Sequence, residues 1–374
     1  MAELVLAAEN RRDAGLGNRI RSLLAPDRPV RGYRIREDPF DYPSFGRKRF
    51  TEVEVSFADG LEPAELLCVL KRLPDKDAVQ ALTGVTEHRE VALIREHVVP
   101  ELADVLAIPY LGTLDDSTVV MRHVGEELAA FAPTGVIPPS TLRQLLSALA
   151  RMHARFWERH PLVQAPWLMR LPAVLERCFR CFRELIGGSS GDELAMYVAA
   201  EWPWLQDGLR RLLQALPPSD RRLMLRLLDD PSIIAVGIDS QPRTLCHFDF
   251  DVRNVGWSGA LGKPVVIDWE MAGAASSACD VARLLTSQRL GGDQQWIQFY
   301  FDRLEEALGE KVERADWQEA YELSRIAAWS IFGVVFASVV NTPASPFPDA
   351  LKNVLRPQAL SDAREIADAL RLRM

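Results

Sequence analysis

The chain has 374 residues, of which 48% are hydrophobic and 26% are charged. This composition excludes a largely disordered protein, and the length suits two domains that share a cleft. The formal net charge is −8 and no long basic cluster with interleaved aromatic residues occurs, which excludes a protein that coats nucleic acid.

No segment predicts secretion or a membrane span. Charged residues directly follow a short apolar stretch at 4–8, whereas a signal peptide has a basic region followed by a longer apolar region. The longest apolar run, 326–340, falls short of the ~20 residues that cross a bilayer and is predicted to be a buried core helix. Five scattered cysteines, an odd number, favour a reducing compartment. We therefore expect a cytoplasmic protein with no membrane partner.

The first third of the chain reads as short strands bounded by turn residues. The stretch 49–60 alternates apolar residues at Thr51, Val53, Val55 and Phe57, which is the pattern of a half-buried strand. Further strands are predicted at 28–38 and 64–74, and two more on either side of a turn at 115–117; a helix is predicted at 85–102.

From residue 125 onward the sequence is mainly helical. The stretch 141–159 has one apolar stripe, with Ser140 in the N-cap position. Cys178 and Cys181 lie in a helical stretch without a second cysteine pair, so we interpret them as packed thiols rather than metal ligands. Other helical stretches are predicted at 193–229, 293–308, 316–340 and 357–372.

These elements predict an α+β fold with two lobes. Residues 1–124 would form a small antiparallel β lobe with one helix. Residues 125–374 would form a larger helical lobe, interrupted by a β-hairpin at 244–270.

Chemistry-bearing residues concentrate in that hairpin. His247, Asp249 and Asn254 fall within eight residues, and Asp268 directly follows the apolar run 265–267. A carboxylate and an amide oxygen are ligands that Mg²⁺ accepts, so Asn254 and Asp268 could bind this ion. Asp249 would then be left to accept a hydrogen bond from an incoming hydroxyl group, as in phosphoryl transfer. Aspartates in loops more often serve as turn or cap residues, and Asp251, Asp229 and Asp230 fit that role.

The segments 247–255 and 267–285 resemble the catalytic and metal-binding segments of the aminoglycoside phosphotransferase and choline-kinase-like superfamily, which is related to protein kinases. Their H-x-D-x-x-x-x-N order, followed by an aspartate and a later D-V-A, carries the resemblance. It extends upstream to a strand with Lys71, a helix with Glu90, a hinge at 119–124 and the helix at 149–157. It covers about residues 40 to 290 and implies a protein-kinase-like fold.

The resemblance implies an ATP-dependent phosphotransferase that acts on a hydroxyl group of a small molecule, such as an aminoglycoside, an amino alcohol or a sugar, with GTP as an alternative donor. Asp249 would orient the hydroxyl group, and Asn254 and Asp268 would bind Mg²⁺. His247 would support the loop, and Asp280 would cap the helix that follows.

For the nucleotide, the resemblance implies that Lys71 contacts the phosphates and is held by Glu90, although Glu87, one turn earlier, is a competing partner. Backbone groups of the hinge, Met121, Arg122, His123 and Val124, would bind the adenine. Ser44 and Gly46 would lie in the phosphate loop, which is poor in glycine.

Two departures from the family pattern stand beside the catalytic aspartate. Phe248 occupies a position where the family usually has glycine. Arg253 replaces the usual glycine before Asn254; it could clamp a phosphate or an acidic acceptor, or pair with Asp251.

Other functions compete with a kinase. A pseudokinase is favoured by Phe248 and by the glycine-poor loop, whereas a metal-dependent hydrolase would use His247, Asp249 and Asp268 as ligands. The acceptor and the oligomeric state are left open. Acidic and aromatic residues of the helical lobe could receive a cationic acceptor or could be ordinary surface and core residues: Asp192, Glu193, Glu201, Asp207, Glu319, Glu322, Trp202, Trp204, Trp317 and Trp329.

Overall fold

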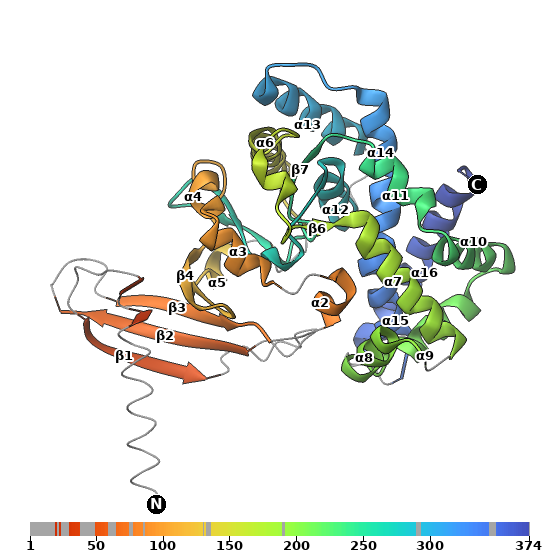
Figure 1. Ribbon diagram of the computed structural model, residues 1–374, viewed down its shortest axis with the longest axis horizontal. Helices are drawn as coiled ribbons and strands as arrows, with labels where there is room; N and C mark the ends of the chain where they lie inside the picture. Colours follow the sequence, from red (N-terminus) through yellow and green to blue (C-terminus); the bar gives the residue numbers. More distant parts are fainter. Residues whose placement is uncertain are drawn as a thin grey trace, which may run out of the picture.

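The computed structural model places a twisted β-sheet at one end of the molecule and a large group of helices at the other (Figure 1). It describes residues 19–20, 22–23, 30–37, 49–58, 65–74, 78–84, 87–129, 131, 136–188, 191–288, 293–343 and 349–373. The predicted combination of a small antiparallel sheet with a larger helical part is confirmed. The boundary between the lobes at residues 124 and 125 stays a prediction.

The sheet has five strands in the order β1-β2-β3-β5-β4, each antiparallel to its neighbours. Alternation decides which face of β2 is buried, since Val53, Val55 and Phe57 are buried and pack with Cys68 and Leu70 of β3. The strands are β1 (Val30–Glu37), β2 (Arg49–Phe57), β3 (Glu65–Arg72), β4 (Tyr110–Asp115) and β5 (Thr118–Arg122).

Two helices occupy the stretch 85–102, where one was predicted. They are α3 (Arg89–Arg95) and α4 (Val98–Leu102), separated by His97, whose φ of 59° is left-handed. Proline in a helix interior clashes with the carbonyl group four residues earlier, so Pro100 is incompatible with a helix that continues through Glu96. The prediction of one continuous helix was therefore wrong. A further helix, α2 (Ala78–Thr83), lies against the helical lobe, where Arg177 Nη2 donates to the carbonyl of Ala81 at 2.8 Å.

After β5 the chain continues with the helices α5 (Gly125–Ala129) and α6 (Pro139–Arg155). Helix α6 starts before Ser140, whose side chain is not its N-cap, because Pro139 takes the first helical position with a preset φ. The helix also ends at Arg155 rather than at residue 159. A single 3₁₀ turn (Pro161–Gln164) follows the helix.

The remaining helices form the bulk of this lobe (Figure 1). The stretch predicted as helical over 193–229 is three helices. The set comprises α7 (Leu171–Gly187), α8 (Glu193–Glu201), α9 (Leu205–Ala215), α10 (Pro218–Asp229), α11 (Ser232–Asp239), α12 (Ala278–Gln288), α13 (Asp293–Leu308), α14 (Arg314–Ala328), α15 (Val334–Asn341) and α16 (Asp349–Arg371), with a π-helical turn at Trp329–Gly333 between α14 and α15.

In the described part of the chain, one helical stretch is long and apolar enough to cross a membrane, Arg314–Asn341. Within the protein, 61% of its most apolar window is buried. Helix α14 packs against α11 and α12, and α15 packs against α9 and α16. The run at 326–340 is thus a mostly buried core helix, as predicted. Cys178 and Cys181 are buried free thiols of the same lobe, and burial raises the pKa of the Cys181 thiol to about 12.

The predicted hairpin at 244–270 divides between two small sheets. Strands β8 (Val255–Ser258) and β9 (Lys263–Val266) form a hairpin. Strand β7 (Arg243–Cys246) instead pairs with β10 (Gly273–Ser276), which pairs in parallel with β6 (Met169–Arg170). The prediction of a single hairpin was wrong, because β7 pairs with β10. The sequence did not predict β10, since its small residues show no strand pattern. A 3₁₀ turn at Trp269–Met271 joins β9 to β10.

Candidate active site

Lys71 is the centre of a buried charge cluster that joins the two lobes. Its Nζ lies 2.8 Å from Glu90 Oε2, 2.7 Å from Asp268 Oδ1 and 3.1 Å from Glu270 Oε1. Strand β3 supplies the lysine, α3 supplies Glu90, and the segment after β9 supplies the other two carboxylates. Glu87 pairs with Arg95 instead, so Glu90 is the partner of Lys71.

Burial and neighbouring charges shift the pKa values of Lys71 and Glu90 in opposite directions. Burial on its own lowers the pKa of Lys71, but the charges of Asp268, Glu270 and Glu90 outweigh it and raise that pKa well above its usual value. Burial raises the pKa of Glu90, and the charge of Lys71 opposes this only in part. Lys71 therefore stays a cation throughout the physiological range.

Two members of the cluster were missed by the sequence analysis. The hydroxyl of Tyr110 donates to Glu90 Oε1 and accepts from the backbone N–H of Trp269 at 3.3 Å. Tyr110 stands on a strand with no polar pattern around it, so nothing in the sequence singles it out. Glu270 lies two residues after Asp268, and this short spacing could have indicated that both carboxylates lie near Lys71.

The backbone brings Asp268, Asn254 and Asp249 together. The N–H of Ile267 donates to the carbonyl of Asn254 at 3.0 Å, which sets Asp268 beside the end of the loop after β7. Asn254 Nδ2 donates to the Asp249 carboxylate (Oδ2) and to its backbone carbonyl, both at 2.9 Å. The three residues that the motif spacing selected therefore lie in one place, and Lys71 contacts that place through Asp268.

The donor groups fit a magnesium ion. Because Asn254 Nδ2 is used by Asp249, the amide oxygen is the atom left to bind a cation. The Asp268 side chain is 33% exposed, against 14% for Glu270 and 0% for Glu90, so it is the carboxylate of the cluster with access to solvent. A carboxylate and an amide oxygen, completed by water and phosphate oxygens, match the ligands that Mg²⁺ takes.

His247 and Asp280 stabilise the loop that contains Asp249. His247 is fully buried, with its Nε2 2.8 Å from the carbonyl oxygen of Ile267 and its ring 4.7 Å from that of Trp269. The Asp280 carboxylate accepts from the backbone N–H groups of His247 and Phe248 at 2.8 and 2.7 Å. The prediction that Asp280 caps its own helix was wrong: α12 begins at Ala278, so Asp280 lies within its first turn, and the carboxylate accepts from the loop. His153 of α6 also lies 3.3 Å from Asp280.

Arg253 and Arg283 both pair with Asp251. Arg253 Nε donates to Asp251 Oδ1 at 3.0 Å, which favours the pairing role over the phosphate clamp. Arg283 Nη2 lies 2.7 Å from Asp251 Oδ2 and 2.9 Å from Asp249 Oδ1. Burial on its own raises the pKa of Asp251, but Arg283 and Arg253 outweigh it and lower that pKa to about 2. Asp251 is therefore a buried carboxylate that binds Arg253 and Arg283, and not only a turn residue.

This lowered pKa predicts how stability depends on pH. A carboxyl group that titrates near 3.9 in the unfolded chain and near 2 in the folded protein stabilises the fold above pH ~4 and loses that effect as the pH falls toward ~2. Asp251→Asn should therefore lower the urea midpoint at pH 6, and its difference from the wild type should shrink steadily below pH 4. Asp116→Asn, at an exposed turn position, is the control and should track the wild type. A difference that is the same at pH 6 and pH 2.5 would contradict the pairing.

Phe248 adopts the left-handed conformation that favours glycine, with φ of 63°. This explains why the family pattern has glycine here. The Phe248 ring is buried, and it occupies space beside Gly273, where an added Cβ would lie 2.6 Å from Phe248 Cε2 and 2.6 Å from the carbonyl oxygen of Met169. Gly273 thus makes room for the bulky residue of the catalytic loop.

We predict that Gly273→Ala destabilises the protein by about 1–3 kcal/mol, since overpacking forces Phe248 or β6 to move. The matched control is Gly259→Ala, where an added Cβ meets nothing within 4 Å, and its effect should stay within about 0.5 kcal/mol. Urea unfolding of both variants measures the difference. Equal midpoints would show that the space beside Phe248 is not tight.

The hinge offers fewer backbone donors than predicted. The N–H of Arg122 donates to the Pro109 carbonyl at 2.8 Å, and that of His123 donates to the Leu67 carbonyl at 3.0 Å. The N–H of Val124 has no hydrogen-bond partner within the described ranges, and its role in binding adenine stays a prediction. Met121 is buried at the end of β5. Ser44 and Gly46 of the predicted phosphate loop lie outside the described residues.

Six of the ten acidic and aromatic candidates for an acceptor pocket make contacts within the helical part of the protein. The Asp192 side chain accepts from the N–H of Ala195 at the start of α8. The indole ring of Trp317 stacks with the phenol rings of Tyr300 and Tyr321 in the core. Two further carboxylates, Asp207 and Glu322, pair with Arg211 and Arg325, and Trp202 and Trp204 are buried and stack on each other. The place of the acceptor in the helical lobe stays a prediction.

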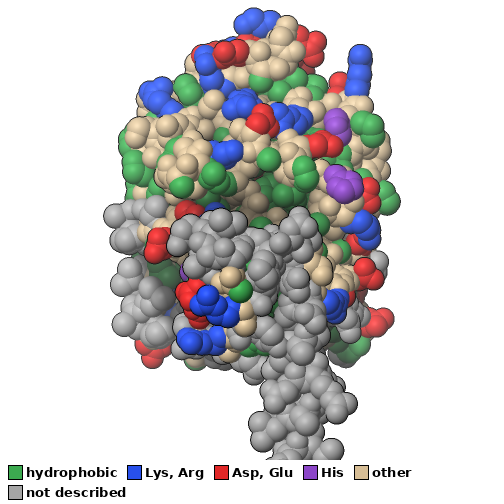
Figure 2. Space-filling view, turned by 90° about the vertical axis from the view of Figure 1, so that its left-hand side faces the viewer, with side chains coloured by type: hydrophobic (Ala, Val, Ile, Leu, Met, Phe, Trp, Pro, Cys, Tyr) green, Lys and Arg blue, Asp and Glu red, His purple; other side chains and the backbone are tan. Residues whose placement is uncertain are grey.

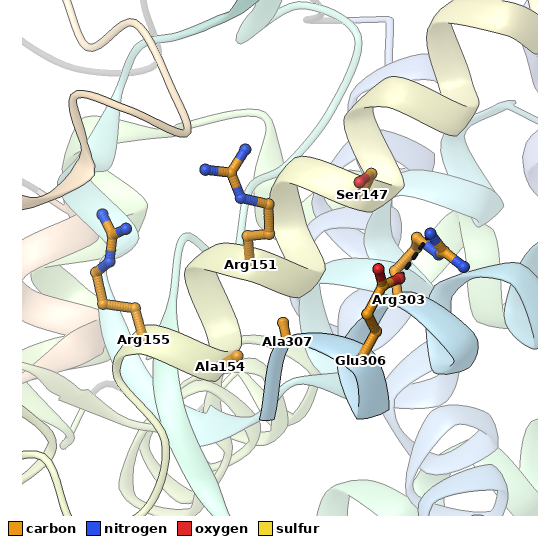
Figure 3. A pocket seen from close by; sticks show the side chains of 7 residues that line it. All are labelled: Ser147, Arg151, Ala154, Arg155, Arg303, Glu306 and Ala307. Carbon is orange, nitrogen blue, oxygen red and sulfur yellow. Dashed lines mark ion pairs between the residues drawn. The ribbon is translucent and has the colours of Figure 1, made fainter. Parts of the chain in front are cut away.

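A surface hollow of about 440 Å³ lies elsewhere, between α6 and α13 (Figure 3). Arg151 and Arg155 point to one side of it and both pair with Asp104, while Arg303 pairs with Glu306 at 2.6 Å. The pairing lowers the pKa of Asp104 to about 2, with the hydrogen bond from Arg155 as the main cause. On the face shown in Figure 2, acidic and basic side chains are likewise interspersed. The candidate active site is therefore the cluster around Lys71 and Asp249.

Comparisons with known proteins place the chain in a family. Residues 68–323, more than half of the chain, match the phosphotransferase enzyme family (APH). No curated protein matches the sequence. Among solved structures, an ethanolamine kinase from Plasmodium vivax is 11% identical, with a TM-score of 0.51 over 88% of this chain and 82% of that one, which establishes a shared fold.

Two further solved structures are similar. Choline kinase LicA from Streptococcus pneumoniae is 14% identical, with a TM-score of 0.49 over 95% of this chain and 99% of that one. An aminoglycoside phosphotransferase from Alicyclobacillus acidocaldarius is 16% identical, with a TM-score of 0.47 over 86% and 89%. On the match over residues 68–323, the chain belongs to the phosphotransferase enzyme family, as its catalytic-loop motif predicted.

Proposed function

We propose that this protein transfers the γ-phosphoryl group of ATP to a hydroxyl group of a small molecule. Asp249 orients the hydroxyl group, Asn254 and Asp268 bind Mg²⁺, and Lys71, held by Glu90, contacts the nucleotide phosphates. The N–H of Val124 binds the adenine base.

One observation carries the proposal: residues far apart in the sequence converge on one place. Lys71 and Asp268 are 197 residues apart, and their side chains lie 2.7 Å apart. Asn254 is hydrogen-bonded to Asp249 by its side chain and to Ile267 by its backbone. Because the chain belongs to a phosphotransferase family, we interpret these converging residues as a phosphoryl-transfer site.

Positioning and charge neutralisation do most of the work in phosphoryl transfer. Bound Mg²⁺ would neutralise charge on the phosphates. Asp249 accepts a hydrogen bond from the acceptor hydroxyl and can take its proton as the new O–P bond forms, while ADP leaves with the bridging oxygen. Lys71 stays charged because three carboxylates surround it, so a fixed cation faces the phosphates.

The hydrolase alternative would need His247 as a metal ligand. Its Nε2 is instead directed at the Ile267 carbonyl, and the ring is enclosed by Trp269 and Phe250. We therefore prefer the kinase.

Thermal unfolding with and without ATP and Mg²⁺, followed by radiolabelled transfer from ATP to a panel of hydroxyl compounds, tests the proposal. We expect ATP to raise the Tm only when Mg²⁺ is present, and the label to appear on an acceptor. Stabilisation without any transfer would favour a pseudokinase, and stabilisation by metal alone would favour a hydrolase.

A further inference from the structure

Arg283 of α12 contacts the oxygen of the Asp249 carboxylate that Asn254 does not contact. Its Nε and Nη2 donate to Asp249 Oδ1 at 3.1 and 2.9 Å, and Nη2 also lies 2.7 Å from Asp251 Oδ2. Its guanidinium carbon lies 4.9 Å from the centre of the Phe332 ring, in the π-helical turn between α14 and α15. The side chain is 12% exposed, so these contacts hold it in one place.

The contacts of Arg283 distinguish the two oxygens of the Asp249 carboxylate. A carboxylate accepts about four hydrogen bonds, two on each oxygen. Arg283 fills both positions on Oδ1, and Asn254 Nδ2 fills one on Oδ2. One position on Oδ2 is left for an incoming hydroxyl group. Arg253, the other cation nearby, is 4.0 Å from Oδ1 and makes its close contact with Asp251.

We propose that Arg283 is a positioning residue for phosphoryl transfer: it fixes Asp249 through Oδ1 so that Oδ2 faces the acceptor hydroxyl. Asp251 and the Phe332 ring fix the guanidinium in turn. An arginine suits this task because its planar guanidinium presents N–H groups in a rigid fork: Nε and Nη2 converge on Asp249 Oδ1, and Nη2 also reaches Asp251 Oδ2. The inference rests on the proposed kinase function and adds a residue that the motif does not contain.

Arg283→Gln should lower kcat by about 10²-fold, since small displacements of a reacting group cost about that much. The Kd for ATP should stay within about twofold, because Arg283 does not belong to the Lys71 cluster. Arg283→Lys should keep more kcat than Arg283→Gln but less than the wild type, since one charged group cannot reproduce the fork. Arg325→Gln, which removes a paired arginine of α14, is the control and should keep the wild-type kcat. An Arg283→Gln variant with wild-type kcat, or one that loses ATP binding and turnover in parallel, would overturn the inference.

A second measurement needs no activity. In a double-mutant cycle of Arg283→Gln and Asp249→Ala, the shifts in the urea midpoint should be non-additive, because each variant alone removes the same contact. Additive shifts would overturn the inference even if the enzyme is a kinase. If the wild type transfers phosphate to no acceptor, the proposed function fails whatever the cycle shows, so the two failures can be told apart.

Discussion

Asp249→Asn is expected to lower kcat by about 10²- to 10⁴-fold, the range for a positioned group that handles a proton. The amide keeps the shape of the side chain, and its oxygen can still accept from Arg283, so the loop should stay folded. What is lost is the negative oxygen that accepts the hydroxyl proton. Steady-state kinetics at saturating ATP measures the effect.

The binding of ATP separates this role from a structural one. Asp249 does not contact Lys71, so calorimetry should give the variant a Kd for ATP within about twofold of the wild type. Asp229→Asn, at a side chain that is 64% exposed, should leave both quantities unchanged. If Asp249→Asn retains wild-type kcat, Asp249 is not the group that handles the proton.

The sequence motif led to residues that lie together in the structure because its members are also close in the sequence. Asp249, Asn254 and Asp268 fall within twenty residues, and phosphoryl transfer needs these side-chain types in this order. The strands were predictable for a similar reason, since alternation at Val53, Val55 and Phe57 is a property of the strand itself.

Residues that act from a distant element gave no such signal. Arg283 resembles any arginine on an amphipathic helix, and only the packing of α12 against α14 directs it to Asp249. The small residues of β10 form a strand because β7 and β6 offer edges to pair with, a tertiary effect that overrides local propensity. Asp280 was recognised as a cap, yet the backbone groups that it caps belong to the loop 33 residues earlier.

Lys71→Met is expected to weaken ATP binding by at least about 30-fold, which corresponds to the loss of about 2 kcal/mol from one charge-assisted contact. It should also lower the free energy of unfolding by about 3–5 kcal/mol, because Glu90 is left as a buried charge without its partner. Calorimetry and urea unfolding measure the two effects separately. Lys311→Met, at a side chain that is 86% exposed, is the control and should change neither.

A double variant should separate the loss of ATP affinity from the loss of stability. Adding Glu90→Gln to Lys71→Met removes the unpaired buried charge, while the amide oxygen can still accept from the hydroxyl of Tyr110. Part of the lost stability should return, because a neutral side chain costs far less to bury than a carboxylate. The affinity for ATP should not return, since no cation faces the phosphates. If the double variant regains affinity together with stability, Lys71 serves the fold alone and the phosphates are bound elsewhere.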